Sequence, residues 1–202
     1  MDKPDYNNFS KDLIELYSVA VKASQHLREM CNAHMITPSS KLEEFAATSL
    51  AAFVKVREHL CNGQFKYDIA DELYSLASKL LELTTKISAL PRLCEIYGIK
   101  TPTEYMREAV IEIAVMCSAL LDTLIPESKY PLQFDIDAVG KIHLTCSGHK
   151  IRCAAAIPRL FKSSPNTISA LIMKDILEEL CSFCEIITQI LGISLVISLK
   201  CP

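Results

Sequence analysis

The chain has 202 residues, of which 50% are hydrophobic and 22% charged, and its formal net charge is −3. An apolar fraction this high excludes a disordered chain, because it is enough to form a packed core. The 21 Lys and Arg against 24 Asp and Glu exclude the basic excess with which nucleic-acid-binding proteins hold phosphates. Five glycines are few for a chain rich in tight β turns or phosphate-binding loops. We therefore expect a soluble, helix-rich protein that does not bind nucleic acid.

Nine cysteines raise the question of a disulfide scaffold. Their number is odd, and the first twelve residues contain no apolar run of the kind found in signal peptides. Six of them fall on the apolar faces of the expected helices, where a reduced cysteine packs as a small hydrophobic side chain: Cys31, Cys94, Cys117, Cys146, Cys153 and Cys184. We expect reduced thiols and a cytoplasmic or other reducing intracellular location.

Apolar residues recur every three or four positions along most of the chain, a spacing that predicts α-helices. The first helix is expected over residues 10–36, with Ser10 as its N-cap. The second begins at Ser40, where Ser40 and Glu43 have the spacing of a capping box, and ends at 62–63, an Asn-Gly pair.

The third helix, expected from Ile69 to just before Gly98, has the most regular apolar repeat, and Pro91 should kink or locally break it. The fourth follows the segment Thr-Pro-Thr-Glu at 101–104, in which Thr101 is the expected cap and Pro102 the first helical residue.

A loop is expected over residues 127–134, followed by a fifth helix from about Asp135 that Pro158 should end or bend. The last helix should start at 164–165, a Ser-Pro pair. From residue 193 onward, alternating apolar residues leave a short strand as an alternative. Six helices with short links predict an all-α fold: a single antiparallel bundle of five to six helices, with residues 1–202 as one domain.

The richest cluster of metal-ligand residue types is His143, Cys146, His149 and Cys153, with Cys181 and Cys184 on the last helix. A continuous helix rises about 15 Å between positions 143 and 153, so those four side chains cannot share one ion. A metal site would instead combine two residues from each helix: Cys146, His149, Cys181 and Cys184. Positions 146, 149 and 153 also lie on the apolar face of the fifth helix, so core packing is the simpler interpretation, and we predict no cofactor.

No sequence motif anchors an enzyme. Glu104, Glu108 and Glu112 are spaced four apart, but they lie off the apolar face of their helix, which predicts a solvated face. The Glu-x-x-His pair of di-iron bundles is absent, as are Gly-x-x-x-x-Gly-Lys and Gly-x-Ser-x-Gly. Catalysis is therefore less expected than binding.

The segment 186–199 contains no charged residue. It allows three interpretations: a buried core helix, a partner-binding face, or a membrane anchor, although about twenty apolar residues are needed to span a bilayer. The residues of the partner-binding interpretation are Ile186, Ile190, Ile193, Val196 and Ile197.

By elimination, we predict a non-catalytic helical bundle that acts through protein–protein contacts, as an adaptor or as a subunit of a larger assembly. Its partner would be another protein or a second copy of the chain. Two alternatives stay open: a small metal- or ligand-binding bundle or enzyme that uses the region of His143, Cys146 and His149, and a membrane protein anchored by residues 186–199.

Overall fold

A computed structural model of the chain describes residues 6–62, 67–125, 133–163 and 166–200. Helices dominate the described residues: α1 (Tyr6–Asn32), α2 (Ser40–Cys61), α3 (Tyr67–Ile96), α4 (Glu104–Asp122), α5 (Ile136–Ser163) and α6 (Thr167–Lys200). Two short antiparallel strands, β1 (Leu124–Ile125) and β2 (Gln133–Phe134), pair between α4 and α5. The predicted all-α bundle is confirmed.

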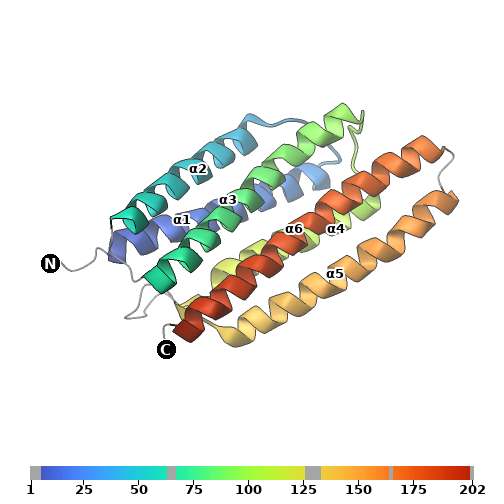
Figure 1. The fold of residues 1–202 in the computed structure, drawn as a ribbon. Helices are drawn as coiled ribbons and strands as arrows, with labels where there is room; N and C mark the ends of the chain where they lie inside the picture. The colour runs from blue at the N-terminus through green and yellow to red at the C-terminus, as the bar shows by residue number, and fades with distance from the viewer. Residues whose placement is uncertain (1–5, 63–66, 126–132, 164–165, 201–202) are drawn as a thin grey trace.

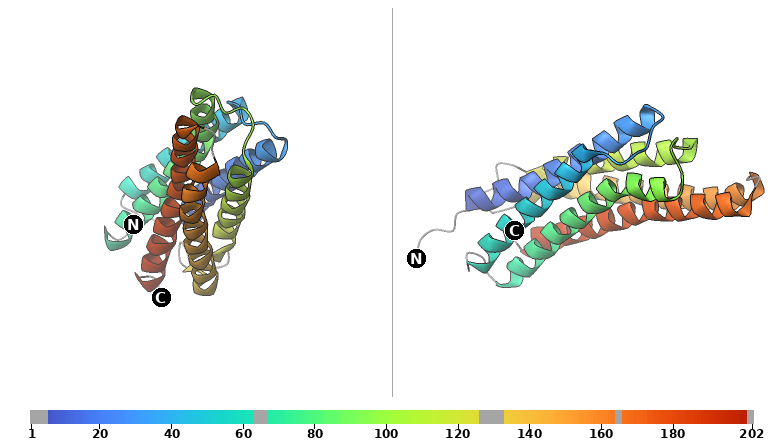
Figure 2. Two further views of the ribbon diagram at one scale, coloured as in Figure 1. Left: turned by 90° about the vertical axis from the view of Figure 1, so that its right-hand side faces the viewer. Right: turned by 90° about the horizontal axis from the view of Figure 1, so that it is seen from above.

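The helices form a layered bundle (Figure 1). At one edge, α2 packs against α1 and α3. In the interior, α1 also contacts α4, and α6 contacts α3 and α4. At the opposite edge, α5 packs on α6 and, less extensively, on α4. The left view of Figure 2 shows α5 between α6 and α4, the two helices that it contacts. One long face of α5 is therefore left without a covering helix in the described chain.

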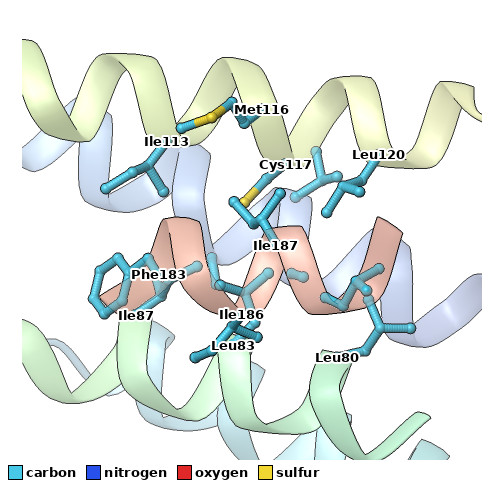
Figure 3. Close-up of a cluster of buried hydrophobic side chains, with 14 of the residues drawn as sticks. Leu80, Leu83, Ile87, Ile113, Met116, Cys117, Leu120, Phe183, Ile186 and Ile187 are labelled. Carbon is cyan, nitrogen blue, oxygen red and sulfur yellow. The ribbon is translucent and has the colours of Figure 1, made fainter. Parts of the chain in front are cut away.

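The core is centred on α6, which lies between α3 and α4 (Figure 3). Its Phe183, Ile186 and Ile187 are buried. They face buried side chains of α3 and α4: Leu80, Leu83, Ile87, Ile113, Met116 and Cys117. Each helix buries one apolar face against its neighbours, as the three-and-four spacing predicts.

Several predicted helix starts are displaced. Helix α1 begins at Tyr6, so Ser10 lies inside it, because Phe9 is buried and extends the apolar face by one turn. Helix α2 is capped by Ser39 rather than Ser40, without a side-chain hydrogen bond. Helix α4 is capped by Thr103, whose hydroxyl accepts the backbone N–H of Met106, and not by Thr101.

The later starts are capped by acceptor side chains. The Asp135 carboxylate accepts the backbone N–H groups of Asp137 and Ala138, which confirms the predicted start of α5. At α6, Asn166 accepts the N–H of Ile168, while the Ser-Pro pair at 164–165 lies outside the described residues. Most of the expected loop at 127–134 also lies outside them, and its described end, Gln133–Phe134, pairs with β1.

Neither helical proline ends its helix. Helix α3 continues through Pro91 to Ile96, and α5 continues through Pro158 to Ser163. Burial of Leu90 and Cys94 on both sides of Pro91 holds α3 in place despite the missing N–H. The strand alternative from residue 193 onward is wrong, since α6 continues to Lys200.

Candidate functional site

All six cysteines predicted on apolar faces are buried. Burial raises the pKa of Cys94 and Cys117 to about 12, so these thiols stay protonated at neutral pH. All the cysteines of the described chain are free thiols. The six buried ones pack as small hydrophobic side chains, as predicted.

The four predicted metal ligands do not form one set. Cys146 interacts with Cys184 across the contact of α5 with α6, whereas Cys181 interacts with Cys153. His149 points instead to α4. Within residues 6–62, 67–125, 133–163 and 166–200, no group of three or more His, Cys, Asp and Glu side chains could hold a metal ion. The structure therefore does not bring Cys146, His149, Cys181 and Cys184 together, and His143 lies exposed on the outside of α5.

The structure brings three other side chains together: Cys153 and His149 of α5 and Glu112 of α4. The Cys153 sulfur lies 3.3 Å from Nε2 of His149, one turn earlier on α5. Nδ1 of the same imidazole is hydrogen-bonded to the Glu112 carboxylate of α4. In the neutral ring, Nδ1–H donates to Glu112 and Nε2 accepts the Cys153 S–H. The trio thus joins a thiol, a base and a carboxylate that orients the base, the order found in thiol nucleophile sites.

Burial and charge hold this trio in place. His149 is only 1% exposed, and the outer oxygen of Glu112 is paired with the Arg152 guanidinium at 2.6 Å. Burial opposes ionisation of Glu112, but hydrogen bonds from Arg152 and His149 outweigh it and hold the pKa of Glu112 below its usual value. The contact with Cys181, together with burial, raises the pKa of Cys153. At rest, Glu112 is therefore ionised and Cys153 is a neutral thiol.

The trio borders a pocket of about 270 Å³ between α4, α5 and α6. His149, Glu112, Arg152 and Cys153 line it together with Glu108. The remaining wall is formed by less polar side chains: Tyr105, Ala109, Ile111, Ala156 and Leu177. The volume lies just below the range of about 300–1,000 Å³ typical of ligand pockets, so the pocket suits a small molecule.

Sequence reasoning placed Cys153 and His149 correctly on the core face and missed Glu112. Glu104 and Glu108 are exposed, as predicted for a solvated face, but Glu112 is only about one-third exposed and is paired. The regular spacing of the three glutamates does not distinguish Glu112 from the two exposed ones. It arises from the position at which α5 crosses α4.

The predicted partner-binding residues are mostly inside the bundle. Ile186, Ile190 and Ile197 are buried in the core, where they cannot meet a partner while the fold is intact. Ile193 is half-buried and Val196 is exposed. The apolarity of residues 186–199 is therefore used largely to hold α6 against the neighbouring helices.

A largely apolar exposed face runs along α5. Its outward positions form what we call the outer stripe. They follow in steps of three or four, apart from the adjacent Ala154 and Ala155: Gly140, Leu144, Ser147, Ile151, Ala154, Ala155, Pro158 and Phe161. Leu144 is 73% and Ile151 70% exposed. None of the eight residues is charged, although the exposed face of a helix in a globular protein is normally polar. The stripe extends for about 32 Å along the helix.

Of the described helices, α6 is the one long and apolar enough to cross a membrane by length and composition. Half of its most apolar 18-residue window is buried within the bundle. The core helix of a soluble protein has the same profile, so this is weak support for a membrane anchor.

Comparisons with known proteins add no relative. No protein family matches the chain, and no curated protein is similar to it.

Proposed function

We propose that the protein acts through protein–protein contacts and that the outer stripe of α5 is its contact surface. The observation that carries this proposal is a stripe of uncharged, exposed residues along α5, at one edge of the bundle. Contiguous exposed apolar surface is characteristic of interaction sites. This surface replaces the one expected around residues 186–199.

The stripe suits a helix as its partner. Leu144, Ile151 and Phe161 provide apolar anchors, and the small residues between them, such as Ala154 and Ala155, leave room for a second helix to approach closely. Anchors at such spacings are the pattern by which an amphipathic helix lies along a groove or a helix face.

The charges beside the stripe select the kind of helix. Every charged residue of α5 from position 138 onward is basic: Lys141, Lys150, Arg152, Arg159 and Lys162. Lys150 and Arg152 are paired with Glu185 of α6 and Glu112 of α4, so the basic flanks are formed mainly by Lys141 and Lys162, at the two ends of the stripe. A partner helix with an apolar face flanked by Asp and Glu would complement this arrangement. A second copy would place basic flanks against basic flanks, so we favour a different protein. A membrane surface is disfavoured because the middle of the stripe is small residues rather than the bulky Trp, Phe and Leu of membrane-binding helices.

The test compares two variants. In Leu144→Glu/Ile151→Glu, two exposed anchors become acidic, and in the control Leu199→Glu the same change is made at an exposed residue of α6 away from the stripe. We expect a stoichiometric partner to be recovered from cell extract by the wild-type chain and the control. The double variant should bind the partner at least about 30-fold more weakly. This corresponds to a loss of about 2 kcal/mol or more of binding free energy, as is typical when central anchors are removed.

Two further measurements identify the partner class. Sedimentation of the purified chain would reveal a dimer that the double variant loses, which would make a second copy the partner. Binding to vesicles of anionic lipid, lost in the same variant, would indicate a membrane instead. A partner that binds the double variant as tightly as the wild type would contradict the proposal.

A further inference from the structure

A second candidate site is separate from the outer stripe and lies on the opposite side of α5. It is the pocket between α4, α5 and α6, with the trio of Cys153, His149 and Glu112 on its wall. The outer stripe requires none of these side chains. Their arrangement therefore calls for its own interpretation.

We propose that this pocket binds small, neutral, largely apolar molecules with a carbonyl conjugated to a C=C bond, and that the Cys153 thiol adds to them with His149 as the base. The Cys153 sulfur and the Nε2 atom of His149 are 3.3 Å apart, within reach for proton transfer between a thiol and a base. Both side chains border the pocket, so a bound molecule would meet the sulfur directly. Glu112 is a positioning residue, because it holds the other ring nitrogen and acts through it.

The charges of the pocket argue for a neutral ligand. Glu108 and Glu112 contribute two negative charges, and Arg152 contributes one positive charge. An anionic ligand would therefore meet a net negative wall. The ion pair with Glu112 runs through one terminal nitrogen of Arg152, and a guanidinium has five N–H donors. Donors are thus left to bind a carbonyl oxygen.

The backbone argues for addition rather than acyl transfer. An acyl-transfer site stabilises its oxyanion with free donors, usually backbone N–H groups. Cys153 is in the interior of α5, where backbone N–H groups are already bonded to carbonyls one turn earlier. Addition to a conjugated carbonyl spreads the negative charge over an enolate, for which one guanidinium is a suitable donor.

The proposed addition needs no group from outside the pocket. His149 Nε2 takes the proton of the Cys153 thiol, and the sulfur forms a bond to the β-carbon of the ligand. The π electron pair of the C=C bond moves to form an enolate, whose oxygen faces Arg152. His149 then returns its proton to the α-carbon. An S–H bond and a C=C π bond are replaced by C–S and C–H bonds, with no leaving group, oxidant or reductant.

The experiment measures adduct formation at each cysteine of the intact protein. The probe is benzylideneacetone, a small neutral enone, and modified peptides are quantified by mass spectrometry at neutral pH. Cys117 is the internal control, because it is also buried, at 1% exposure against 5% for Cys153, and does not line the pocket. We expect Cys153 to react at least about tenfold faster than Cys117. A general base typically accelerates a reaction by about 10²-fold or more, so a tenfold difference is a conservative expectation.

A matched pair of variants tests the trio. Glu112→Gln removes the charge that holds His149, and Glu104→Gln makes the same change at an exposed carboxylate of α4 that does not line the pocket. We expect Glu112→Gln to slow labelling of Cys153 about tenfold and to shift its pH profile to lower pH. Glu104→Gln should change neither. The ionisable groups that face the thiol are Glu112 from α4, His149 and Arg152 from α5, and Cys181 from α6.

Binding and chemistry are then separated with the saturated analogue benzylacetone. It cannot form an adduct, so it should slow labelling of Cys153 by occupying the pocket while leaving exposed Cys61 unaffected. Labelling of Cys153 no faster than that of Cys117 would overturn the proposal. An adduct on Cys181 in place of Cys153, equal rates in both glutamine variants, or no protection by benzylacetone would each do the same.

Discussion

Replacing Phe183 by alanine is expected to lower the free energy of unfolding by about 3–5 kcal/mol, the range for deleting a buried aromatic ring. Phe183 is fully buried in the middle of α6, among side chains of α3 and α4 (Figure 3). Neighbours on several helices cannot all relax into the space that the ring leaves, so a cavity adds to the lost transfer free energy. Urea unfolding followed by circular dichroism measures the difference.

Leu199→Ala is the matched control on the same helix. Leu199 is 78% exposed, and its truncation should change the free energy of unfolding by no more than about 0.5 kcal/mol. A cost below about 1 kcal/mol for Phe183→Ala would show that α6 does not form the centre of the core.

Removing the carboxylate of Glu112 should have the second-largest effect. Glu112→Ala leaves the buried His149 without its hydrogen-bond partner and Arg152 without its ion pair. A buried donor left unsatisfied costs about 1–3 kcal/mol. The control is Glu178→Ala, which removes an exposed pair with Lys174 one turn away, worth about 0.3–0.5 kcal/mol. Equal costs for the two variants would contradict the burial of the pair.

The same carboxylate gives stability a pH dependence with a defined sign. The pKa of Glu112 is lower in the folded protein than the value of about 4.3 typical of an unfolded chain. Its contribution is therefore complete above that pH and is lost as the pH falls through the lower folded-state pKa. Urea unfolding between pH 7 and pH 3 should show a smaller loss for Glu112→Gln than for the wild type. The same loss in both would contradict this assignment.

The sequence predicted the helices better than their ends. Apolar spacing reports which residues can share a buried face, and this holds for all six helices. Caps depend on local competition between neighbouring acceptors, as where Thr103 rather than Thr101 accepts the N–H of Met106. Helix ends also depend on tertiary contacts. Burial of Phe9 extends α1, and packing carries α3 through Pro91.

Neither site could be predicted from the sequence of one helix, because each depends on how the helices pack together. Cys153 and His149 could be placed on the core face of their helix, but Glu112 joins them only through the crossing of α4 and α5. The most apolar segment, residues 186–199, attracted the partner prediction, yet high apolarity on all sides is what a central helix requires. The outer stripe is less apolar, and only the packing of α5 at the edge of the bundle shows that its face is uncovered.

The central position of α6 has a consequence during synthesis. Five helices precede it along the chain, and the faces of α3 and α4 that it covers stay open to water until it has emerged from the ribosome. At about 5–20 residues per second, the 34 residues of α6 take a few seconds to synthesise. During that interval the nascent bundle exposes Leu80, Leu83 and Ile113, a surface that chaperones for apolar segments would recognise. The core therefore cannot close before α6 has been synthesised.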